Sequence, residues 1–462
     1  MRILLVVYDN DSYVSQFPLG LAYVATVWRE RGHDVQVYSQ DIYHWPESHL
    51  LNLLNNEHFD IVAVSVIGGY YQYSKLLKIS KAINNSRQRP FYLLGGHGPA
   101  PEPEYFMRKT SADVIVMGEG EVTALEIIEA LEGDRSLASV RGIAYNDNGK
   151  CVINPPRELI KNLDEIGFPA WDLFPMDHYL LRKMSGAKNN NRTLILLAGR
   201  GCDFKCNFCY RMDKGLRLRS VENIVEEMVL LNKKYNVLNF SFRDELTMCS
   251  EERITAIAEG ILRTGLDCKW ECMGRLNYAK PDVLKLMAKA GCVYVNYGIE
   301  SLDQQALNVM NKGLTVKMIH EGIQNTLAAG ISPGINVIFG NIGETRESLK
   351  LGVDFLLKYS DAVELRTIRP VTAYPGSPLY YYAIEKGLLK DCEDFYENKH
   401  VNSDLVAVNF TDLSDDEFHE ALFDANRILI EDYFEKICAR NIATAHKLYR
   451  ERDRTFRGFR QE

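Results

Sequence analysis

The sequence predicts an α/β protein with an open parallel sheet first, a partial barrel second and a mainly helical C-terminal extension last. Strand-like and helix-like segments alternate over residues 1–155, and a second strand–helix series starts near residue 193. Beyond residue 378 the chain becomes tyrosine-rich and then mostly helical. A chain of 462 residues is too long for one ordinary hydrophobic core, so two or three domains are expected.

The first sheet is predicted from five short apolar runs with helical or polar segments between them. Residues 19–31 have the apolar spacing of a helix, and residues 76–83 indicate another. Polar or glycine-rich segments follow several of the runs. Because ligands bind beyond the carboxyl ends of parallel strands, these segments predict a site at that edge. The strand-like runs are residues 3–8, 34–38, 60–66, 91–94 and 113–116.

The second series has six strand-like runs, fewer than the eight of a closed barrel, so it predicts an open, partial barrel. A proline-containing stretch separates the two series and is expected to be a linker. Ser414-Asp415-Asp416-Glu417 has the pattern of a helix start. The expected units are a first domain over 1–155, a linker over 156–192, a second domain over 193–380 and an extension over 381–462. The six runs are residues 193–198, 237–243, 269–273, 293–297, 334–339 and 362–368.

Composition narrows the class of protein. The chain is 46% hydrophobic and 25% charged with a net charge of −8, so a basic nucleic-acid-binding surface is not expected. The apolar runs are too short for a membrane span, and no signal-peptide pattern is present, so a cytoplasmic protein is expected. Residues 440–462 carry seven Lys or Arg and three acidic residues, which indicates a solvated end or a patch for an anionic partner.

Three of the ten cysteines lie within eight residues, just after the first strand of the second series. Cys202, Cys206 and Cys209 have C-x3-C-x2-C spacing, with no fourth cysteine nearby and no histidine within twenty residues. Structural zinc normally takes four protein ligands, so a zinc site would lack one. A [4Fe–4S] cluster held by three cysteines leaves one iron open to a small molecule. The cluster is therefore favoured over a zinc knuckle or a chance triplet.

This motif, at the end of the first strand of a partial barrel and followed by an aromatic residue, resembles the radical S-adenosylmethionine (radical SAM) superfamily. The resemblance implies that the three cysteines bind a [4Fe–4S] cluster whose open iron is chelated by S-adenosylmethionine (SAM). Reductive cleavage of SAM then yields a 5′-deoxyadenosyl radical. Phe208 and Tyr210 are expected near the cluster or the adenine, or in ordinary packing at the barrel mouth.

The same resemblance predicts further SAM-binding residues at the ends of later strands. Asp244 and Glu245 are expected to bind the methionyl ammonium, or to be a helix-capping pair. Arg275 is expected to bind the methionyl carboxylate, or to be an ordinary exposed arginine. Glu300 and Ser301 are expected near the ribose or the methionine. Two departures are visible: relatives have two aspartates before Phe-Thr, and a proline before the glycine of the fifth-strand motif.

The first domain and the linker resemble those of anaerobic magnesium-protoporphyrin cyclase-type radical enzymes. The implied fold is a Rossmann-like (flavodoxin-like) cobalamin-binding sheet, followed by a partial (β/α)6 TIM-type radical SAM barrel. Glycines after strands allow a backbone to approach a bulky planar cofactor. A flavodoxin-like or nucleotide-binding sheet, or one without a cofactor, is the alternative, although no G-x-G-x-x-G follows the first strand. The predicted cobalamin-binding residues are Asp11, Ser65, Tyr70, Gly95, Gly96, His97, Gly118, Glu119 and Gly120.

No histidine occurs in the loop after the first strand, where many cobalamin proteins carry the lower axial ligand of cobalt. Tyr70 or Tyr71 is expected to cover that face, and His97 to contact the nucleotide tail rather than cobalt.

The resemblance implies a methyltransferase that moves a methyl group from methylcobalamin to an unactivated carbon or phosphorus after hydrogen abstraction. The alternatives are a cyclase, a ring-rearranging or oxidative enzyme without methyl transfer, or a non-catalytic cobalamin and iron–sulfur sensor. The expected cofactors are a [4Fe–4S] cluster, SAM and cobalamin. The expected partners are a small-molecule, peptide or lipid substrate and an external electron donor of the flavodoxin or ferredoxin type, with no nucleic acid and no membrane span.

Overall fold

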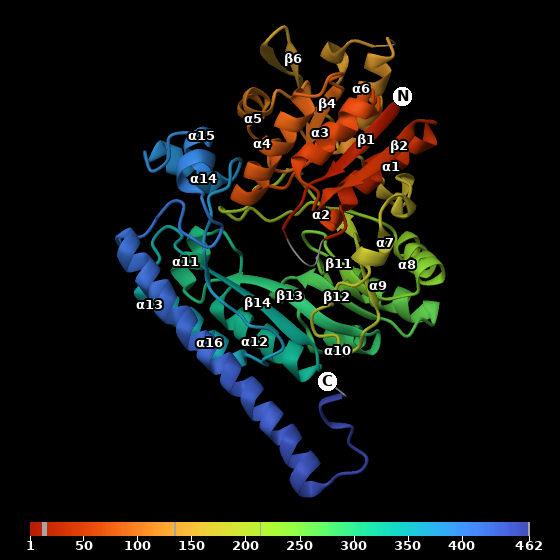
Figure 1. Cartoon of the computed structure of the whole chain (residues 1–462). Coiled ribbons are helices and arrows are strands. Elements are labelled where there is room, and N and C mark those ends of the chain that lie inside the picture. Colours follow the sequence, from red (N-terminus) through yellow and green to blue (C-terminus); the bar gives the residue numbers. More distant parts are fainter. Residues whose placement is uncertain (12–15, 134, 213, 461–462) are drawn as a thin grey trace.

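The first α/β unit contains a seven-stranded sheet in the order β2-β1-β3-β4-β5-β6-β7 (Figure 1). The computed structural model describes residues 1–11, 16–133, 135–212 and 214–460. The five predicted strands form a parallel sheet, while β6 and β7 add an antiparallel edge that the sequence did not predict. The strands are β1 (Arg2–Val7), β2 (Asp34–Ser39), β3 (Ile61–Ser65), β4 (Phe91–Gly95), β5 (Val114–Val116), β6 (Ile143–Asp147) and β7 (Lys150–Ile153).

Helices cover both faces of this sheet because side chains alternate along each strand. In β1, Ile3 and Leu5 pack into the hydrophobic cluster that includes α1 and α6. Leu4 and Val6 point the other way, into the cluster that includes α3, α4 and α5. The helices of this unit are α1 (Leu19–Glu30), α2 (Gln40–Tyr43), α3 (Glu47–Asn56), α4 (Tyr70–Asn84), α5 (Pro103–Thr110) and α6 (Gly120–Leu131).

The second unit is a curled parallel sheet in the order β15-β14-β13-β12-β11-β8. Its two edge strands do not pair with each other, so the predicted partial barrel is confirmed. A two-stranded ribbon of β9 (Gly199–Arg200) and β10 (Arg217–Leu218) follows β8. The six strands are β8 (Arg192–Leu196), β11 (Val237–Phe242), β12 (Lys269–Gly274), β13 (Cys292–Glu300), β14 (Ser332–Phe339) and β15 (Arg369–Pro370).

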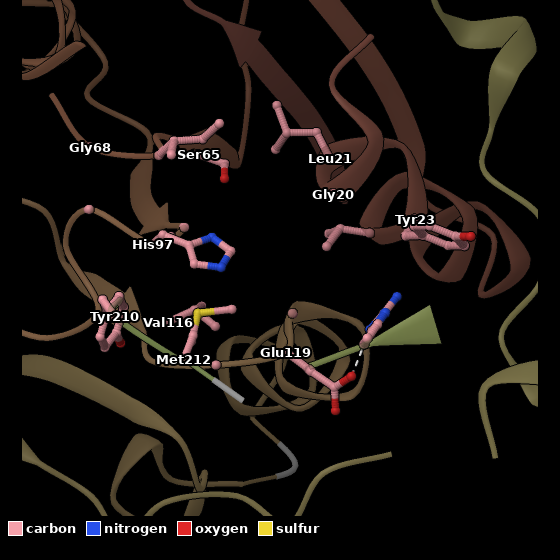
Figure 2. Close-up of a pocket in the computed structure, with 18 of the residues that line it drawn as sticks. Gly20, Leu21, Tyr23, Ser65, Gly68, His97, Val116, Glu119, Tyr210 and Met212 are labelled. Carbon is pink, nitrogen blue, oxygen red and sulfur yellow. Dashed lines mark hydrogen bonds and ion pairs between the residues drawn. The ribbon is translucent and has the colours of Figure 1, made fainter. Parts of the chain in front are cut away.

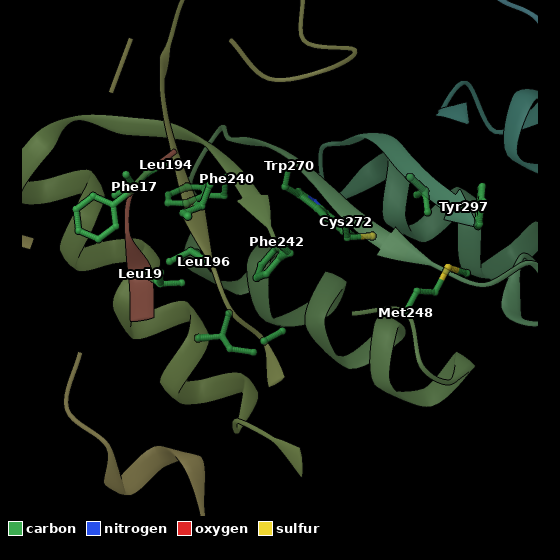
Figure 3. Close-up of a cluster of buried hydrophobic side chains, with 14 of the residues drawn as sticks. Phe17, Leu19, Leu194, Leu196, Phe240, Phe242, Met248, Trp270, Cys272 and Tyr297 are labelled. Carbon is green, nitrogen blue, oxygen red and sulfur yellow. The ribbon is translucent and has the colours of Figure 1, made fainter. Parts of the chain in front are cut away.

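The convex face of the half-barrel is apolar and the concave face is polar. Phe240, Phe242 and Trp270 are buried in the main hydrophobic cluster (Figure 3). The alternate residues Ser241 and Glu271 hydrogen-bond each other at 2.5 Å. The helices of this unit and its linker are α7 (Met176–Tyr179), α8 (Val221–Tyr235), α9 (Glu251–Thr264), α10 (Pro281–Lys289), α11 (Gln304–Val309), α12 (Val316–Ala328) and α13 (Arg346–Tyr359).

The predicted sixth strand, residues 362–368, is wrong. The chain bends at Ala362, where φ is +53°, and Arg366 donates hydrogen bonds to the carbonyl of Pro333 and to Asp361. These contacts hold the segment as a loop despite its apolar alternation. On the side of β14 away from β13, the described residues that pair with it are those of β15, Arg369 and Pro370, opposite Ile338 and Phe339.

The C-terminal extension contains a long helix, as predicted. Ser414 caps the helix and forms a capping box with Glu417. Phe418 then stacks on Phe339 of β14 with ring centres 4.9 Å apart, which joins the extension to the half-barrel. None of the helices in the described part of the chain is long and apolar enough to cross a membrane. The helices of the extension are α14 (Pro378–Glu385), α15 (Cys392–Asp394) and α16 (Asp415–His446).

The linker joins the two units through an aromatic cluster. The ring of Phe17, which precedes α1, lies 4.4 Å from Trp171, 4.9 Å from Phe174 and 5.3 Å from Tyr179. Figure 3 shows Phe17 beside Leu194 of β8. The edge of the first sheet is therefore packed against the start of the half-barrel.

Candidate active site

A cavity of about 920 Å³ lies between the carboxyl edge of the first sheet and the mouth of the half-barrel. Figure 2 shows Ser65, Gly68 and His97 on one side, facing Leu21 and Tyr23 of α1. The half-barrel supplies the rest of the wall. Its lining residues include Leu197, Gly199, Arg200, Phe208, Cys209, Tyr210, Met212, Arg243, Asp244, Glu245, Met273 and Asn296. One cavity thus reaches the predicted sites of both cofactors.

On the sheet side, backbone rather than side chains forms much of the wall. Gly96 has a φ of +99°, and a Cβ there would lie 2.2 Å from the carbonyl oxygen of Val66. A Cβ at Gly98 would lie 2.6 Å from the carbonyl oxygen of Ile67. This close-packed backbone cradle suits a large planar cofactor with a long tail. The predicted residues that line it are Ser65, Gly95, Gly96, His97, Gly118, Glu119 and Gly120.

Two predicted cobalamin-binding residues are not in the cavity lining. Asp11 is exposed, and its N–H donates to Asp9 at 2.7 Å. Tyr70 begins α4 and is 37% exposed. Ser12 and Tyr13 of the same predicted loop lie outside the described residues. His97 does line the cavity, and its ring centre lies 6.4 Å from that of Tyr210.

Glu119 is engaged in a way the sequence did not predict. Its carboxylate accepts hydrogen bonds from Arg200 and Arg217 of the half-barrel, both at 2.7 Å, and from the N–H of Ile160 at 2.8 Å. Arg200 also pairs with Glu121. Burial opposes ionisation of Glu119, but the Ile160 N–H and the two guanidinium groups lower its pKa overall. Glu119 thus forms a buried ionic joint between the two units, and its contact with cobalamin stays a prediction.

The cysteine loop follows β9 and is anchored at its centre by Asn207. The side chains of Asn207 and Asn341 exchange hydrogen bonds at 3.0 and 2.9 Å, and the carbonyl of Asn207 accepts from the N–H of Leu379 at 2.8 Å. Asn341 follows β14, and Leu379 belongs to α14. The loop is thereby fixed to the far side of the half-barrel.

The three thiols lie close enough to affect one another. Burial raises the pKa of Cys202, and the neighbouring Cys206 raises it further. Cys209 faces the cavity, and Cys206 and Cys202 add to the effect of burial in raising its pKa to about 11. Among the described residues, no three His, Cys, Asp or Glu side chains converge closely enough for a single metal ion. A cubane needs wider spacing, since each thiolate binds a different iron, so this donor set fits the cluster.

The acidic pair predicted to bind the methionyl ammonium lines the cavity beside this loop. Asp244 is 3% exposed, and its Oδ1 accepts from the N–H of Ala198 at 3.0 Å. Its Oδ2 is buried without a hydrogen-bond partner among the described residues. Burial raises the pKa of Asp244 to about 6. A cationic donor in the cavity would satisfy this oxygen, so the site fits an ammonium group. Glu245 accepts from the N–H of Gly201 at 3.1 Å.

Of the remaining predicted SAM contacts, Arg275, Glu300 and Ser301 lie outside the cavity lining. Arg275 donates to the carbonyl of Lys312, and its guanidinium lies 3.4 Å from the ring centre of Phe204 in the cysteine loop. Glu300, with a φ of +73°, pairs with Lys312 at 3.0 Å. Ser301 donates to Glu344 at 2.8 Å, and Phe208 and Tyr210 line the cavity as expected. Arg275 therefore supports the cysteine loop, and its pairing with a methionyl carboxylate stays a prediction.

Sequence reasoning missed the contribution of α1 to the cavity. Gly20, Leu21 and Tyr23 line it, because the start of the helix after β1 lies at the same edge as the strand ends. The place of this helix directly after the first strand could therefore have predicted that its first residues line the site. Met212 and Tyr396 also line the cavity, but they come from segments with no pattern of their own.

Two families match the chain in the order that the fold suggests. Residues 6–128 match the B12 binding domain, and residues 196–356 match the Radical SAM superfamily. An uncharacterized methyltransferase of Pyrococcus horikoshii is 32% identical over 400 residues, covering 84% of each chain. This chain belongs to the cobalamin-dependent radical SAM enzymes. Its cofactors are accordingly a [4Fe–4S] cluster, SAM and cobalamin.

A cyclase matches this radical SAM enzyme over about half of the cyclase's own length, whereas a solved structure matches it over most of both chains. The anaerobic magnesium-protoporphyrin IX monomethyl ester cyclase of Rubrivivax gelatinosus is 30% identical over 63% of this chain and 53% of the cyclase. The solved structure of the methyltransferase TsrM from Kitasatospora setae, with cobalamin and a [4Fe–4S] cluster bound, has a TM-score of 0.74 at 18% identity, covering 92% and 89% of the two chains. The fold is therefore shared with TsrM.

Proposed function

We propose that this radical SAM enzyme is a methyltransferase that acts on an unactivated carbon or phosphorus centre. The observation that carries the proposal is the single cavity, which extends from the glycine cradle of the first sheet to the cysteine loop and Asp244. When bound, the cluster and SAM supply a carbon radical, and cobalamin supplies the methyl group. The similarity to a methyltransferase over 84% of both chains supports the same activity.

The residues have distinct roles in this proposal. Cys202, Cys206 and Cys209 hold the cluster at the cavity wall. The buried carboxylate of Asp244 binds the ammonium of SAM and orients it toward the loop. Gly96 lets its loop pack against the backbone of Val66, which shapes the wall that receives the corrin. The ionic joint at Glu119 fixes the distance between the two cofactor sites, which positions the reacting groups and limits the entry of water.

Product analysis tests this function. Anaerobically reduced enzyme, incubated with SAM and extract from the source cells, is expected to form both 5′-deoxyadenosine and S-adenosylhomocysteine. A product whose mass exceeds that of the substrate by one CH₂ should appear together with these two compounds. The similarity to cyclases favours one second candidate, a cyclisation or rearrangement. If deoxyadenosine forms without S-adenosylhomocysteine, the methyltransferase proposal is wrong and a cyclisation or rearrangement is favoured.

The proposal also implies partners. Reduction of the cluster requires a one-electron donor, for which we propose a flavodoxin or ferredoxin in the cytoplasm. The substrate is proposed to be a small molecule, or a peptide or lipid that can reach the cavity.

The glycine cradle can be tested with a matched pair of substitutions. Gly96→Ala is expected to weaken cobalamin binding at least tenfold, because the new Cβ collides with the carbonyl of Val66. Gly133→Ala is the control: its φ of +96° gives similar backbone strain, but no atom lies within 4 Å of its Cβ. Cobalamin retention after gel filtration, read from the absorption spectrum, distinguishes the two. If both variants lose the same amount of cobalamin, the glycine cradle does not form the cobalamin site.

The ionic joint can be tested by unfolding. Arg200→Met leaves the buried carboxylates of Glu119 and Glu121 with fewer partners, so we expect the free energy of unfolding to fall by about 3 kcal/mol. Arg29→Met removes an exposed pair with Asp172 and is expected to cost less than about 1 kcal/mol. Urea titrations followed by tryptophan fluorescence give both values. If the ionic joint does not stabilise the protein, the two variants will lose the same free energy of unfolding.

A further inference from the structure

A second, smaller pocket of about 260 Å³ lies on the concave face of the half-barrel. No role proposed above uses it. It is bounded by the inner faces of β11 to β14 and by a linker segment that crosses the open side. Its lining residues are Arg182, Ser185, Phe242, Arg243, Glu271, Cys272, Met273, Tyr294, Asn296, Asn336 and Glu364.

The pocket is polar because the strands present every second residue to the concave side. Glu271 of β12, Tyr294 and Asn296 of β13, and Asn336 of β14 take these positions. The residues between them, such as Trp270 and Val295, are fully buried in the outer core. An inner face that served only for packing would be apolar, so this alternation indicates a binding surface.

Both carboxylates of the pocket are already satisfied within the protein. Glu271 accepts from Arg243 at 2.7 Å and from the N–H of Ser185 at 3.1 Å. Glu364 accepts from the hydroxyl of Tyr294 at 2.6 Å and from the hydroxyl of Ser185. These bonds hold the linker segment over the pocket and leave the carboxylates with little capacity for a ligand.

The unsatisfied groups are mainly cationic donors. Arg182 is half-buried and forms no hydrogen bond or ion pair among the described residues. The Nε of Arg243 and the Oδ1 of Asn296 are buried without hydrogen-bond partners in the described part of the chain. Burial and the like charge of Arg243 lower the pKa of Arg182, while the charge of Glu271 acts in the opposite direction. An anion between the two guanidinium groups would relieve their repulsion.

The pocket adjoins the large cavity. Arg243, Met273 and Asn296 line both. A molecule anchored in the pocket can therefore extend past these three side chains toward the cofactor sites. The distance between the anchored group and the cofactor sites would then determine which atom of the ligand reaches the reacting centre.

We propose that this pocket binds an anionic group of the substrate, a carboxylate or a phosphate, through Arg182 and Arg243. The amide nitrogen of Asn336 can donate to the same group, and the free Oδ1 of Asn296 can accept from a donor next to it on the ligand. The identification of the ligand as substrate rests on the proposed function, whereas the anion site itself does not. Arginine suits both anions because its fork of donors matches two oxygens at once.

Anion titration of the holoenzyme tests the proposal. The full chain is loaded with cluster, cobalamin and S-adenosylhomocysteine, and then titrated with inorganic phosphate and, separately, with acetate, by calorimetry. We expect one site for at least one of these ions, and the tighter of the two identifies the substrate's group. Arg182→Gln should weaken that binding about tenfold or more, whereas Arg427→Gln, on the exposed face of α16, should not change it.

A second variant makes the test independent of Arg182. Asn336→Asp places a negative charge in the pocket and should also weaken anion binding at least tenfold. Cobalt content and deoxyadenosine formation are measured in the same samples. If wild-type protein binds neither ion, or if both variants bind as well as wild type, the inference is overturned. If anion binding behaves as expected while no deoxyadenosine forms, the proposed function fails and the anion site stands.

Discussion

Cys206→Ala is expected to remove the visible iron–sulfur absorbance and to reduce deoxyadenosine formation to background. Cys206 is the central member of the cysteine loop and is buried. No other side chain of the loop can replace a lost cysteine ligand of the cubane, because the loop contains no further thiol or imidazole. Cobalamin uptake should persist, since the glycine cradle belongs to the other unit. Anaerobic reconstitution followed by spectroscopy and chromatography measures all three.

Cys438→Ala is the matched control. Cys438 is exposed on α16, far along the chain from the loop, and its substitution should leave the cluster intact. Deoxyadenosine formation that survives in Cys206→Ala would contradict the assignment of the cluster ligands.

Asp244→Asn is expected to have opposite effects on SAM affinity and on stability. The substitution removes the carboxylate that we assign to the ammonium of SAM, so binding should weaken about ten- to a hundredfold. The protein without SAM should become more stable at pH 7, by about 1 to 3 kcal/mol, because a buried ionised carboxylate with an unpaired oxygen is removed. Equilibrium dialysis and urea unfolding measure the two quantities.

The pH dependence follows from the pKa of Asp244, which burial raises to about 6. Since the folded state binds this proton more tightly than the unfolded state, the destabilising contribution of Asp244 is absent below the unfolded pKa of 3.8 and grows as pH rises to about 6. SAM affinity should fall as pH drops below about 6 in wild type and stay flatter in Asp244→Asn. Parallel profiles for the two proteins would show that Asp244 does not bind the ammonium.

Local patterns were sufficient to predict the main architecture. Strands β1 to β5, β8 and β11 to β14 have short apolar runs, and the start of α16 has its capping residues at Ser414 and Glu417, so each of these could be found within a few residues of sequence. The cysteine loop could also be found locally, because cluster chemistry fixes both residue type and spacing. Residues 362–368 have the same apolar alternation, but Arg366 forms contacts that hold them in a loop.

Partners distant in sequence could not be predicted. Glu119 was expected to bind cobalamin, but its ion pairs with two arginines about 80 and 100 residues further along the chain were not foreseen. Arg275 was expected to bind the methionyl carboxylate or to be exposed, and its contacts with Phe204 and Lys312 were not foreseen. The polar pocket combines residues from four strands with a linker segment that looked only like a connection. Such pairings depend on the final packing of the elements and leave no local pattern.

The central claim is that one cavity brings an iron–sulfur cluster and cobalamin together. Elemental analysis of a single sample tests it most directly: the full chain, purified and reconstituted anaerobically with both cofactors, is assayed for iron, inorganic sulfide, cobalt and zinc. We predict four irons and four sulfides for each cobalt, with one cobalt per chain. Zinc in place of iron, or iron without inorganic sulfide, would contradict the claim.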